Sequence, residues 1–192
     1  MIKAIIFDCF GVLTDTKWNI FLVSLDQSVQ SEVQYLHKSF DLGHIEYGYL
    51  ADRIEELTGL SRNKIDDVFI NRSSYHKNTE LIELIKQLSK EYKTGVLSNV
   101  GTNWIRETLL TKDEAAAFNS FTLSYENKMA KPDPRMYQLA CTSLGVEPSQ
   151  VVFVDDNINY CKAAENIGMK AILYKDFIQF KHELEALLAD SN

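Results

Sequence analysis

The sequence predicts an α/β fold with a parallel sheet core and a helical insertion after the first strand. Short runs of β-branched and aromatic residues recur along the chain, and amphipathic helical patterns separate most of them. Residues 15–78 break this alternation because their pattern is helical throughout. Alternating buried strands and amphipathic helices are typical of a parallel sheet that is covered by helices.

The first predicted strand is Ile2–Phe7, which stops at Asp8 and is followed closely by Gly11, as expected of a buried strand that ends in a tight loop. The next segment reads as successive helices, with no convincing strand. Three glycines lie between these helices: Gly43, Gly48 and Gly59. We therefore predict two lobes that share one cleft, a core of residues 1–14 and 79–192 and a helical cap of residues 15–78.

The second part of the chain alternates regularly between strand and helix patterns. The predicted strands are Thr94–Leu97, Val151–Val154 and Ala171–Tyr174. The predicted helices are Thr79–Glu91, Pro134–Leu144, Tyr160–Ile167 and Phe177–Ala189. Asp133 is a typical N-cap before Pro134, Gly145 a typical stop, and Gly168 ends the following helix in the same way.

The composition excludes several classes of protein. The chain has 192 residues and a net charge of −7, so nucleic acid and anionic membrane surfaces would repel it at long range. Its longest purely apolar stretches, such as Ala4–Phe7 and Val151–Val154, are far shorter than the roughly 20 residues of a membrane helix. No signal-peptide pattern opens the sequence, and the odd number of cysteines (Cys9, Cys141 and Cys161) suits reduced thiols. A cytoplasmic protein is expected.

Polar side chains follow the predicted strands, where ligands bind in open α/β sheets. Each one alone has an ordinary explanation as a helix cap or a turn residue. Together they would converge on one site, and caps need not cluster in this way. The residues are Asp8, Ser98, Asn99, Asp155 and Asp156, with Lys131 in a loop just before a helix.

Crowded carboxylates need a cation, since two of them about 4 Å apart repel by roughly 4 kcal/mol at an effective dielectric constant of 20. Ligands that are all oxygen atoms favour Mg²⁺. With Lys131, the ion would attract a phosphate despite the acidic chain. A carboxylate aimed at a bound phosphoryl group is a nucleophile that would form an aspartyl phosphate, and Ser98 and the amides after it would hold the phosphoryl oxygens.

Four segments of the chain, in this order, resemble the motifs of the haloacid dehalogenase-like hydrolase superfamily. They are Ile5–Leu13 (IIFDCFGVL), Val96–Asn99 (VLSN), Lys131–Asp133 (KPD) and Val152–Asn157 (VFVDDN). The resemblance covers nearly the whole chain. It implies a Rossmann-like core and a small helical cap after the first strand, which match the two predicted lobes.

The resemblance also implies a role for each matching residue. Asp8 corresponds to the nucleophile, Ser98 to the phosphate-binding hydroxyl and Lys131 to the charge-neutralising lysine, with Asn99 beside the substrate. For Mg²⁺, it implies Asp8, the backbone carbonyl of Phe10, and the acidic pair Asp155 and Asp156, of which Asp156 is the expected direct ligand. The implied activity is hydrolysis of a small phosphorylated metabolite.

One position departs from the pattern of the family's phosphatases. These enzymes usually have a second aspartate two residues after the nucleophile, where this chain has Phe10. That aspartate protonates the leaving alcohol, and general acid/base catalysis contributes typically 10²–10⁴ in rate. Substrates whose leaving group departs readily, such as a sugar 1-phosphate or an acyl phosphate, would suffer least. Asp15, His44 and His76 are the candidates for a replacement acid.

Two alternatives remain open at this point. An aromatic residue at position 10 also resembles the superfamily's dehalogenases, whose halide leaves without a proton; those enzymes generally lack the paired acids that this chain has as Asp155 and Asp156. A non-catalytic binding module is the other alternative. Activity that requires Mg²⁺, metal-independent release of halide, and binding without turnover would distinguish the three.

The cap is expected to set specificity because it closes over the cleft and excludes water. Trp104 is a further candidate for lining the cleft, and Cys9 is expected to point into the core. The sequence is compatible with a monomer or a homodimer. The cap residues that we expect at the substrate are Trp18, Asn19, His44, Tyr47, Tyr49, Arg53, Tyr75 and His76.

Overall fold

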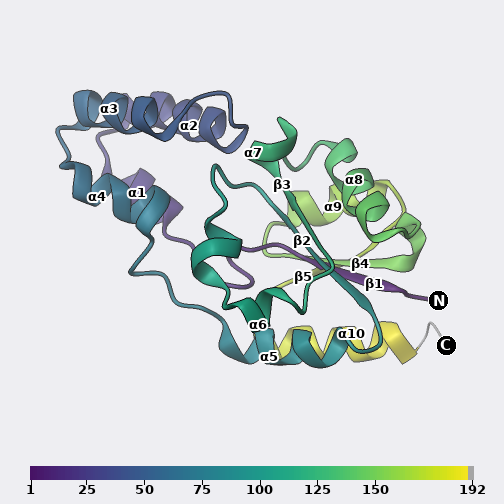
Figure 1. The fold of residues 1–192 in the computed structure, drawn as a ribbon. Coiled ribbons are helices and arrows are strands. Elements are labelled where there is room, and N and C mark those ends of the chain that lie inside the picture. The colour runs from purple at the N-terminus through teal and green to yellow at the C-terminus, as the bar shows by residue number, and fades with distance from the viewer. Residues whose placement is uncertain (190–192) are drawn as a thin grey trace.

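The computed structural model of the protein describes residues 1–189. Its centre is a sheet of five parallel strands in the order β3-β2-β1-β4-β5 (Figure 1). In chain order the strands are β1 (Ala4–Phe7), β2 (Lys93–Ser98), β3 (Ser120–Leu123), β4 (Val151–Asp155) and β5 (Lys170–Leu173). This arrangement confirms the predicted α/β class with a parallel sheet.

The first strand lies in the middle of the sheet. Phe7 is level with Val96 on β2 and with Val154 on β4, so Asp8 leaves the sheet beside the ends of both neighbouring strands. The sequence analysis missed β3, whose four residues pair with the outer edge of β2. Its two central residues are Phe121 and Thr122, too short a run to distinguish from a loop by pattern alone.

Helices cover both faces of the sheet (Figure 1). On one face lie α5 (Thr79–Leu88) and α10 (Phe177–Ala189), and on the other lie α8 (Pro134–Leu144) and α9 (Ile158–Asn166). Asp133 caps α8 by accepting a hydrogen bond from the Arg135 amide, as predicted. The helix ends at Gly145, whose φ of 63° is the left-handed conformation that glycine adopts readily.

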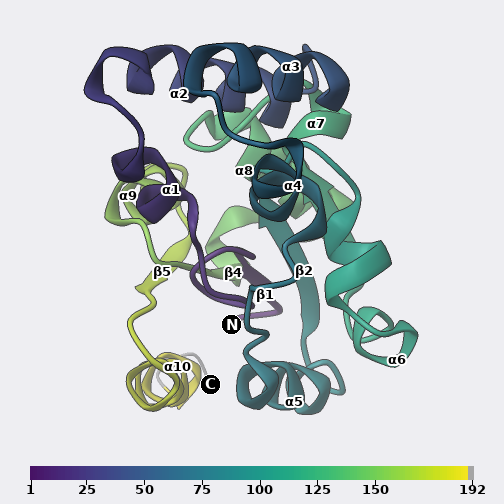
Figure 2. The same ribbon diagram turned by 90° about the vertical axis from the view of Figure 1, so that its left-hand side faces the viewer.

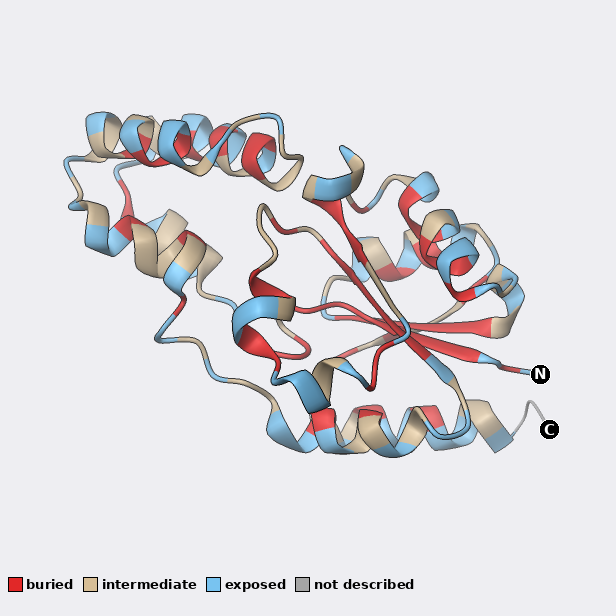
Figure 3. Cartoon of the chain, in the orientation of Figure 1, coloured by how far each residue is buried: buried red, intermediate tan, exposed pale blue. Residues whose placement is uncertain are grey.

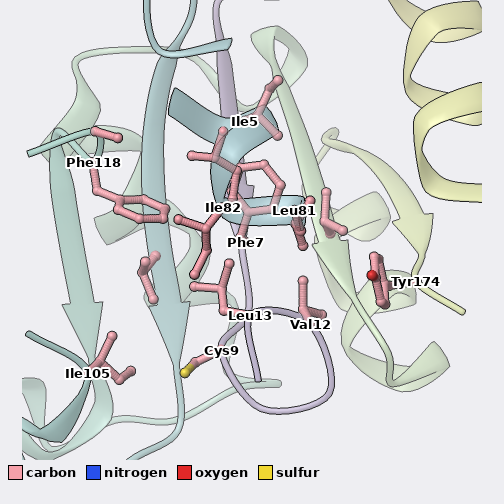
Figure 4. Close-up of a cluster of buried hydrophobic side chains, with 14 of the residues drawn as sticks. Ile5, Phe7, Cys9, Val12, Leu13, Leu81, Ile82, Ile105, Phe118 and Tyr174 are labelled. Carbon is pink, nitrogen blue, oxygen red and sulfur yellow. The ribbon is translucent and has the colours of Figure 1, made fainter. Parts of the chain in front are cut away.

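Each face of the sheet has its own hydrophobic core, visible as the buried inner surfaces of the strands and helices (Figure 3). Figure 4 shows the larger core, in which Ile5 and Phe7 of β1 pack with Leu81 and Ile82 of α5. Cys9 also lies in this core, fully buried, as predicted from its position at the strand end. Two packed layers of helix therefore fix the carboxyl ends of the strands.

Short elements complete the core lobe. They are a π-helical turn (Ile105–Leu109), α6 (Lys112–Ala115), α7 (Ser124–Asn127) and a 3₁₀ turn (Pro148–Gln150). α7 directly follows β3 and contacts the helical segment inserted after β1.

The segment between β1 and α5 forms a separate helical layer beyond the carboxyl ends of the strands (Figures 1 and 2). Its elements are α1 (Trp18–Ser24), α2 (Gln27–Asp41), α3 (Tyr47–Thr58), α4 (Arg62–Asp66) and a π-helical turn (Asp67–Asn71). We call α1–α4 and this turn the helical insertion. Residues 15–78 are all described, and none of them belongs to a strand of the sheet.

The helical insertion packs around a hydrophobic core of its own. Phe69 of the π-helical turn is at its centre and makes edge contacts with the rings of Trp18, Phe21 and Phe40. This separate core explains why the sequence pattern of the insertion is amphipathic without any strand. Among the described helices, none is long and apolar enough to cross a membrane.

Candidate active site

Two hydrogen bonds hold Asp8 at the carboxyl end of β1, one through its backbone amide and one through its side chain. Its amide donates to the Val154 carbonyl at 2.8 Å, and its Oδ1 accepts from the Cys9 amide at 2.6 Å. The residue is 6% exposed. Burial raises the pKa of the neighbouring Cys9 thiol, which points into the core, so this thiol stays protonated and takes no part in the site.

A tight turn after Asp8 brings the chain close to Asp156, the residue that follows β4. Gly11 has a φ of 87°, and a Cβ at this position would lie 2.2 Å from Asp156 Oδ2. The carbonyl of Cys9 closes the turn by accepting from the amides of Leu13 and Thr14 at 2.8 and 3.0 Å. Glycine is therefore required both by the backbone conformation and by the approach of a carboxylate.

Lys131 joins two of the carboxylates. Its Nζ lies 2.8 Å from Asp8 Oδ1 and 2.6 Å from Asp155 Oδ2, and it is buried. Burial alone would lower the pKa of Lys131, but Asp155 and Asp8 together raise it above its ordinary value. The ammonium is thus charged and neutralises part of the acidic cluster.

Asn99 and Tyr160 position the loop that carries Lys131. Asn99 Oδ1 accepts from the Lys131 amide at 2.8 Å, and Asn99 Nδ2 donates to the Lys131 carbonyl at 3.1 Å. The ammonium also lies 5.0 Å from the centre of the Tyr160 ring, within the range of a cation–π contact. In the structure Asn99 is thus placed to hold the lysine loop in addition to lining the cleft.

The three acids of the site have ligand oxygens within 4.8 Å of one another: Asp8, Asp155 and Asp156. Asp155 is fully buried and accepts from the Asn157 amide at 2.8 Å, whereas Asp156 is exposed to the cleft. Burial, opposed by Lys131, raises the pKa of Asp155, and burial and the Asp8 charge raise that of Asp156. One lysine against three carboxylates leaves an acidic site that favours a cation.

These residues fit a hard divalent cation. The donors are carboxylate oxygens, the set that Mg²⁺ prefers, and no nitrogen or sulfur ligand belongs to the cluster among the described residues. Like charges about 4 Å apart repel by roughly 4 kcal/mol per pair at an effective dielectric constant of 20. A bound cation would remove this repulsion and depress the raised pKa values.

A cleft of about 670 Å³ lies between the sheet and the helical insertion, and Asp8 and Asp156 of the acidic cluster line it. From the core lobe it is lined by Asp8, Phe10, Asn99, Lys131 and Asp156, among others. Ser98, by contrast, is fully buried at the end of β2 and does not line the cleft, and its hydroxyl has no hydrogen-bond partner among the described residues.

The cap residues expected at the substrate divide into two groups. Trp18, Asn19 and Tyr75 line the cleft. The others do not: His44, Tyr47, Tyr49, Arg53 and His76.

The three candidates for a replacement acid, Asp15, His44 and His76, are also absent from the cleft lining. Asp15 Oδ2 lies 3.1 Å from His76 Nδ1, and the His76 side chain is 84% exposed. This pair therefore belongs to the connection between the lobes rather than to the site.

Several cleft residues were missed by the sequence analysis. His37 and Asp41 of α2 form a pair, with Nε2 3.3 Å from Oδ2, and Arg72 follows the π-helical turn. The spacing of His37 and Asp41, four residues apart on a helix, was the available signal. Arg72 carried no such signal, because its position depends on how the insertion returns to the core.

The chain is similar in sequence to known hydrolases. The family model for haloacid dehalogenase-like hydrolases matches residues 2–168. YhcW of Bacillus subtilis, whose name describes a phosphatase, is 27% identical over 209 residues, covering 97% of this chain and 93% of its own. (S)-2-haloacid dehalogenase 1 of a Pseudomonas species is 27% identical over 176 residues, covering 81% of this chain and 77% of its own.

Solved structures show the same fold. A haloacid dehalogenase family enzyme of Bacteroides thetaiotaomicron, in a magnesium complex, is 26% identical with a TM-score of 0.75, covering 91% of this chain and 93% of that one. An L-2-haloacid dehalogenase of Xanthobacter autotrophicus, with chloropropionic acid covalently bound, shares the fold at 17% identity and a TM-score of 0.64, covering 97% of this chain and 83% of that one. The chain is thus similar both to a relative named as a phosphatase and to dehalogenases.

Proposed function

Since the chain belongs to the haloacid dehalogenase-like hydrolase family, we propose that it is a magnesium-dependent phosphatase of small phosphorylated metabolites. The observation that carries the proposal is the cluster of Asp8, Asp155 and Asp156 around the Lys131 ammonium, beside a cleft that Asp8 and Asp156 line. Three carboxylates suit a metal and a phosphoryl group, whereas displacement of halide from carbon requires no such acidic pair.

Asp8 is the proposed nucleophile. Its Oδ1 accepts from Lys131 and from the Cys9 amide, and Oδ2 has no partner among the described residues. Oδ2 would attack phosphorus, the ester P–O bond would break, and the leaving oxygen would depart with the electron pair. Water would then attack phosphorus and the bond between Oδ2 and phosphorus would break, which regenerates the carboxylate and releases inorganic phosphate; the protons of the water pass to the phosphate and to solvent.

Lys131 and Ser98 are proposed to hold the transferred group. The ammonium would offset charge on the phosphoryl oxygens while it stays fixed by Asp155. Ser98 is proposed from its motif position and from its hydroxyl, which has no partner among the described residues; because it is buried and outside the cleft lining, it would donate to one of these oxygens only after a local shift that opens it to the cleft. Asn99 would act through Lys131, because it holds both polar groups of that residue's backbone.

Mg²⁺ would be held by Asp8, Asp156 and the Phe10 carbonyl, with Asp155 beside them. When bound, it supplies charge neutralisation and polarises a phosphoryl oxygen. The raised pKa values of Asp155 and Asp156 support this assignment, since burial and the Asp8 charge disfavour their ionised forms and Lys131 offsets this only in part.

Phe10 limits the substrates that such a site can turn over quickly. Its ring packs against Trp104, with centroids 6.0 Å apart and planes inclined by 16°. Because residue 10 is phenylalanine, no carboxyl at this position can protonate a leaving alcohol. Phosphates with readily departing leaving groups, such as sugar 1-phosphates or acyl phosphates, are the proposed substrate class.

The first test is hydrolysis of p-nitrophenyl phosphate, whose phenolate leaves without a proton. We expect activity with Mg²⁺, none with EDTA, and a loss of about 10³-fold or more in kcat/KM for Asp8→Asn. Asp176→Asn is the matched control, because Asp176 also follows a strand, is exposed, and caps α10 through the Gln179 amide. It should retain the activity of the unaltered chain.

Two results would contradict the proposal. Halide release from 2-chloropropionate that depends on Asp8 but not on metal would assign a dehalogenase. Equal p-nitrophenyl phosphate hydrolysis by the unaltered chain and by Asp8→Asn would leave a binding module, for which ligand screening is the next measurement.

A further inference from the structure

Arg72 is a buried cation of the cleft that the proposed phosphatase chemistry does not use. The residue is 6% exposed, lines the cleft, and its Nη1 has no hydrogen-bond partner among the described residues. A buried charged donor without a partner is costly, so native structures rarely retain one without a reason. The structure thus contains an unsatisfied guanidinium next to the substrate space.

Aromatic rings fix the position of this guanidinium. Its Cζ lies 5.0 Å from the centre of the Phe10 ring and 4.9 Å from the centre of the Trp104 ring. Tyr75 completes the cluster, with its ring 6.2 and 6.1 Å from those of Phe10 and Trp104 in edge orientations. Rings that hold the flat guanidinium leave its edge donors available to a ligand.

Within residues 1–189, no carboxylate forms an ion pair with Arg72. Burial lowers the pKa of Arg72, and Tyr75, Asp41 and Cys9 oppose this shift; Asp41, the carboxylate of these three, pairs with His37 at 3.3 Å. Lys131, in contrast, has both Asp8 and Asp155 as partners within 2.8 Å. Of these two buried cations, Arg72 is therefore the one with a free donor for an anion that comes from outside the chain.

We propose that Arg72 binds a second oxyanion on the leaving portion of the substrate, which makes the substrate a phosphate ester that also carries a carboxylate or a further phosphate. The edge of a guanidinium matches the geometry of both oxyanions, often with two parallel hydrogen bonds. This inference rests on the proposed phosphatase function, and it identifies Arg72 as a specificity-determining residue. The aromatic cluster beside it would contact the body of the leaving group.

The test uses three aryl phosphates with similar leaving phenols. They are 4-(carboxymethyl)phenyl phosphate, its neutral amide and 4-(phosphonomethyl)phenyl phosphate. The unaltered chain should favour the carboxylate or the phosphonate over the amide by about 10- to 100-fold in kcat/KM, mainly through KM, because a charge-assisted hydrogen bond is replaced by a neutral one. Whichever anion gives the larger ratio identifies the oxyanion.

Variants assign the preference to Arg72. In Arg72→Gln the ratio should fall to about 1, and Arg72→Lys, which keeps the charge but not the planar fork, should retain part of it. Lys64→Gln is the matched control, since Lys64 is an exposed cation of α4 in the helical insertion and does not line the cleft. Its ratio should stay that of the unaltered chain. Circular dichroism and melting temperatures verify that each variant is folded.

Binding by calorimetry separates this inference from the proposed function. Titration with 4-hydroxyphenylacetate, 4-hydroxyphenylacetamide and 4-hydroxybenzylphosphonate requires no turnover. If the chain hydrolyses none of the phosphates, yet binds one of the two anions better than the amide and loses that difference in Arg72→Gln, the phosphatase proposal fails and the Arg72 site stands. Failure to favour either anion over the amide, or a preference that survives in Arg72→Gln, would overturn the Arg72 site.

Discussion

At the scale of single residues, the site contains polar side chains with an atom that has no hydrogen-bond partner among the described residues. Asp8 offers Oδ2 while Oδ1 is fixed by Lys131 and by the Cys9 amide. Ser98 has a buried hydroxyl with no partner among the described residues. A buried polar atom without a partner, such as the Ser98 hydroxyl, costs about 1–3 kcal/mol of folding free energy. Such arrangements are typical of functional sites, where a ligand supplies the missing partner.

Gly11 gives a prediction that separates backbone strain from a clash with the acidic cluster. Gly11→Ala would place a Cβ 2.2 Å from Asp156 Oδ2 at a φ of 87°, whereas Gly168→Ala has a φ of 95° and no atom within 4 Å. We expect both variants to lose about 1–2 kcal/mol of stability from strain. Gly11→Ala alone should lose at least tenfold in Mg²⁺-dependent activity, because Asp156 is displaced.

Urea unfolding and p-nitrophenyl phosphate kinetics measure the two effects separately. If Gly168→Ala lost as much activity as Gly11→Ala, strain in general would be responsible and the role of the Asp156 approach would be wrong.

The sequence could predict the site residues at the ends of the strands but not those that the helical insertion contributes. Asp8, Asp155 and Lys131 follow or flank strands of the core, and parallel strands bring their carboxyl ends together in any such sheet. His37, Asp41 and Arg72 lie on the helical insertion or at its end, and their approach to the ends of the strands depends on tertiary packing. Local sequence contains no record of that packing. For the same reason the sequence suggested Asp15, His44 and His76 as replacement acids, and none of them lines the cleft.

At the scale of elements, strong local signals gave correct boundaries and weak ones did not. α8 begins after its Asp133 cap and ends before Gly145, as predicted from cap chemistry. β3 was missed because four residues at the edge of a sheet show no periodicity that exceeds that of a loop. α6 is equally short, but its capping box gives it a local signal, and Glu114 of that box also pairs with Lys77 in the segment that returns from the helical insertion.

Glu114 of α6 gives a prediction about the attachment of this helix. It accepts from the Thr111 amide at 2.7 Å and from Lys77 Nζ at 2.7 Å, with its side chain 14% exposed. We expect Glu114→Gln to lose about 1 kcal/mol at pH 7, because a capping contact and a partly buried ion pair are weakened. Glu83→Gln, whose partner Lys86 is 3.4 Å away on the exposed face of α5, should lose less than about 0.5 kcal/mol.

The pH dependence follows from the pKa of Glu114. Burial would raise it, but Lys77 and the Thr111 contacts lower it below its ordinary value overall. A carboxyl with a lowered folded-state pKa contributes stability above its unfolded pKa of about 4.3, and this contribution is lost as the pH falls through the folded value. The difference between the unaltered chain and Glu114→Gln, measured by urea unfolding, should therefore shrink below about pH 4. A difference that is constant from pH 7 to pH 3 would contradict the ion pair.

At the scale of the whole molecule, the core lobe and the helical insertion are joined by the two connecting chains and by contacts between α7 and α2. The outgoing and returning chains run side by side, with the Asn78 amide donating to the Leu13 carbonyl at 2.8 Å and Thr14 Oγ1 donating to the His76 carbonyl at 3.0 Å. The Ser124 hydroxyl of α7 donates to the Asp41 carbonyl of α2. The insertion is thereby held over the carboxyl ends of the strands, where the cleft forms.

The proposed Mg²⁺ site predicts that a divalent cation stabilises the whole molecule. A ligand that binds the folded chain alone adds RT ln(1 + [L]/Kd), about 2.7 kcal/mol at a hundred times Kd. For a chain of this size, each kcal/mol raises Tm by about 2–4 °C. We therefore expect saturating Mg²⁺ to raise Tm by about 5–10 °C relative to EDTA in thermal unfolding followed by circular dichroism. Asp156→Asn, which lacks one of the three clustered carboxylates, should lose most of this shift, and Asp176→Asn should keep it. An equal shift in both variants would show that the ion stabilises the chain from another site, and would contradict the assignment of the cluster.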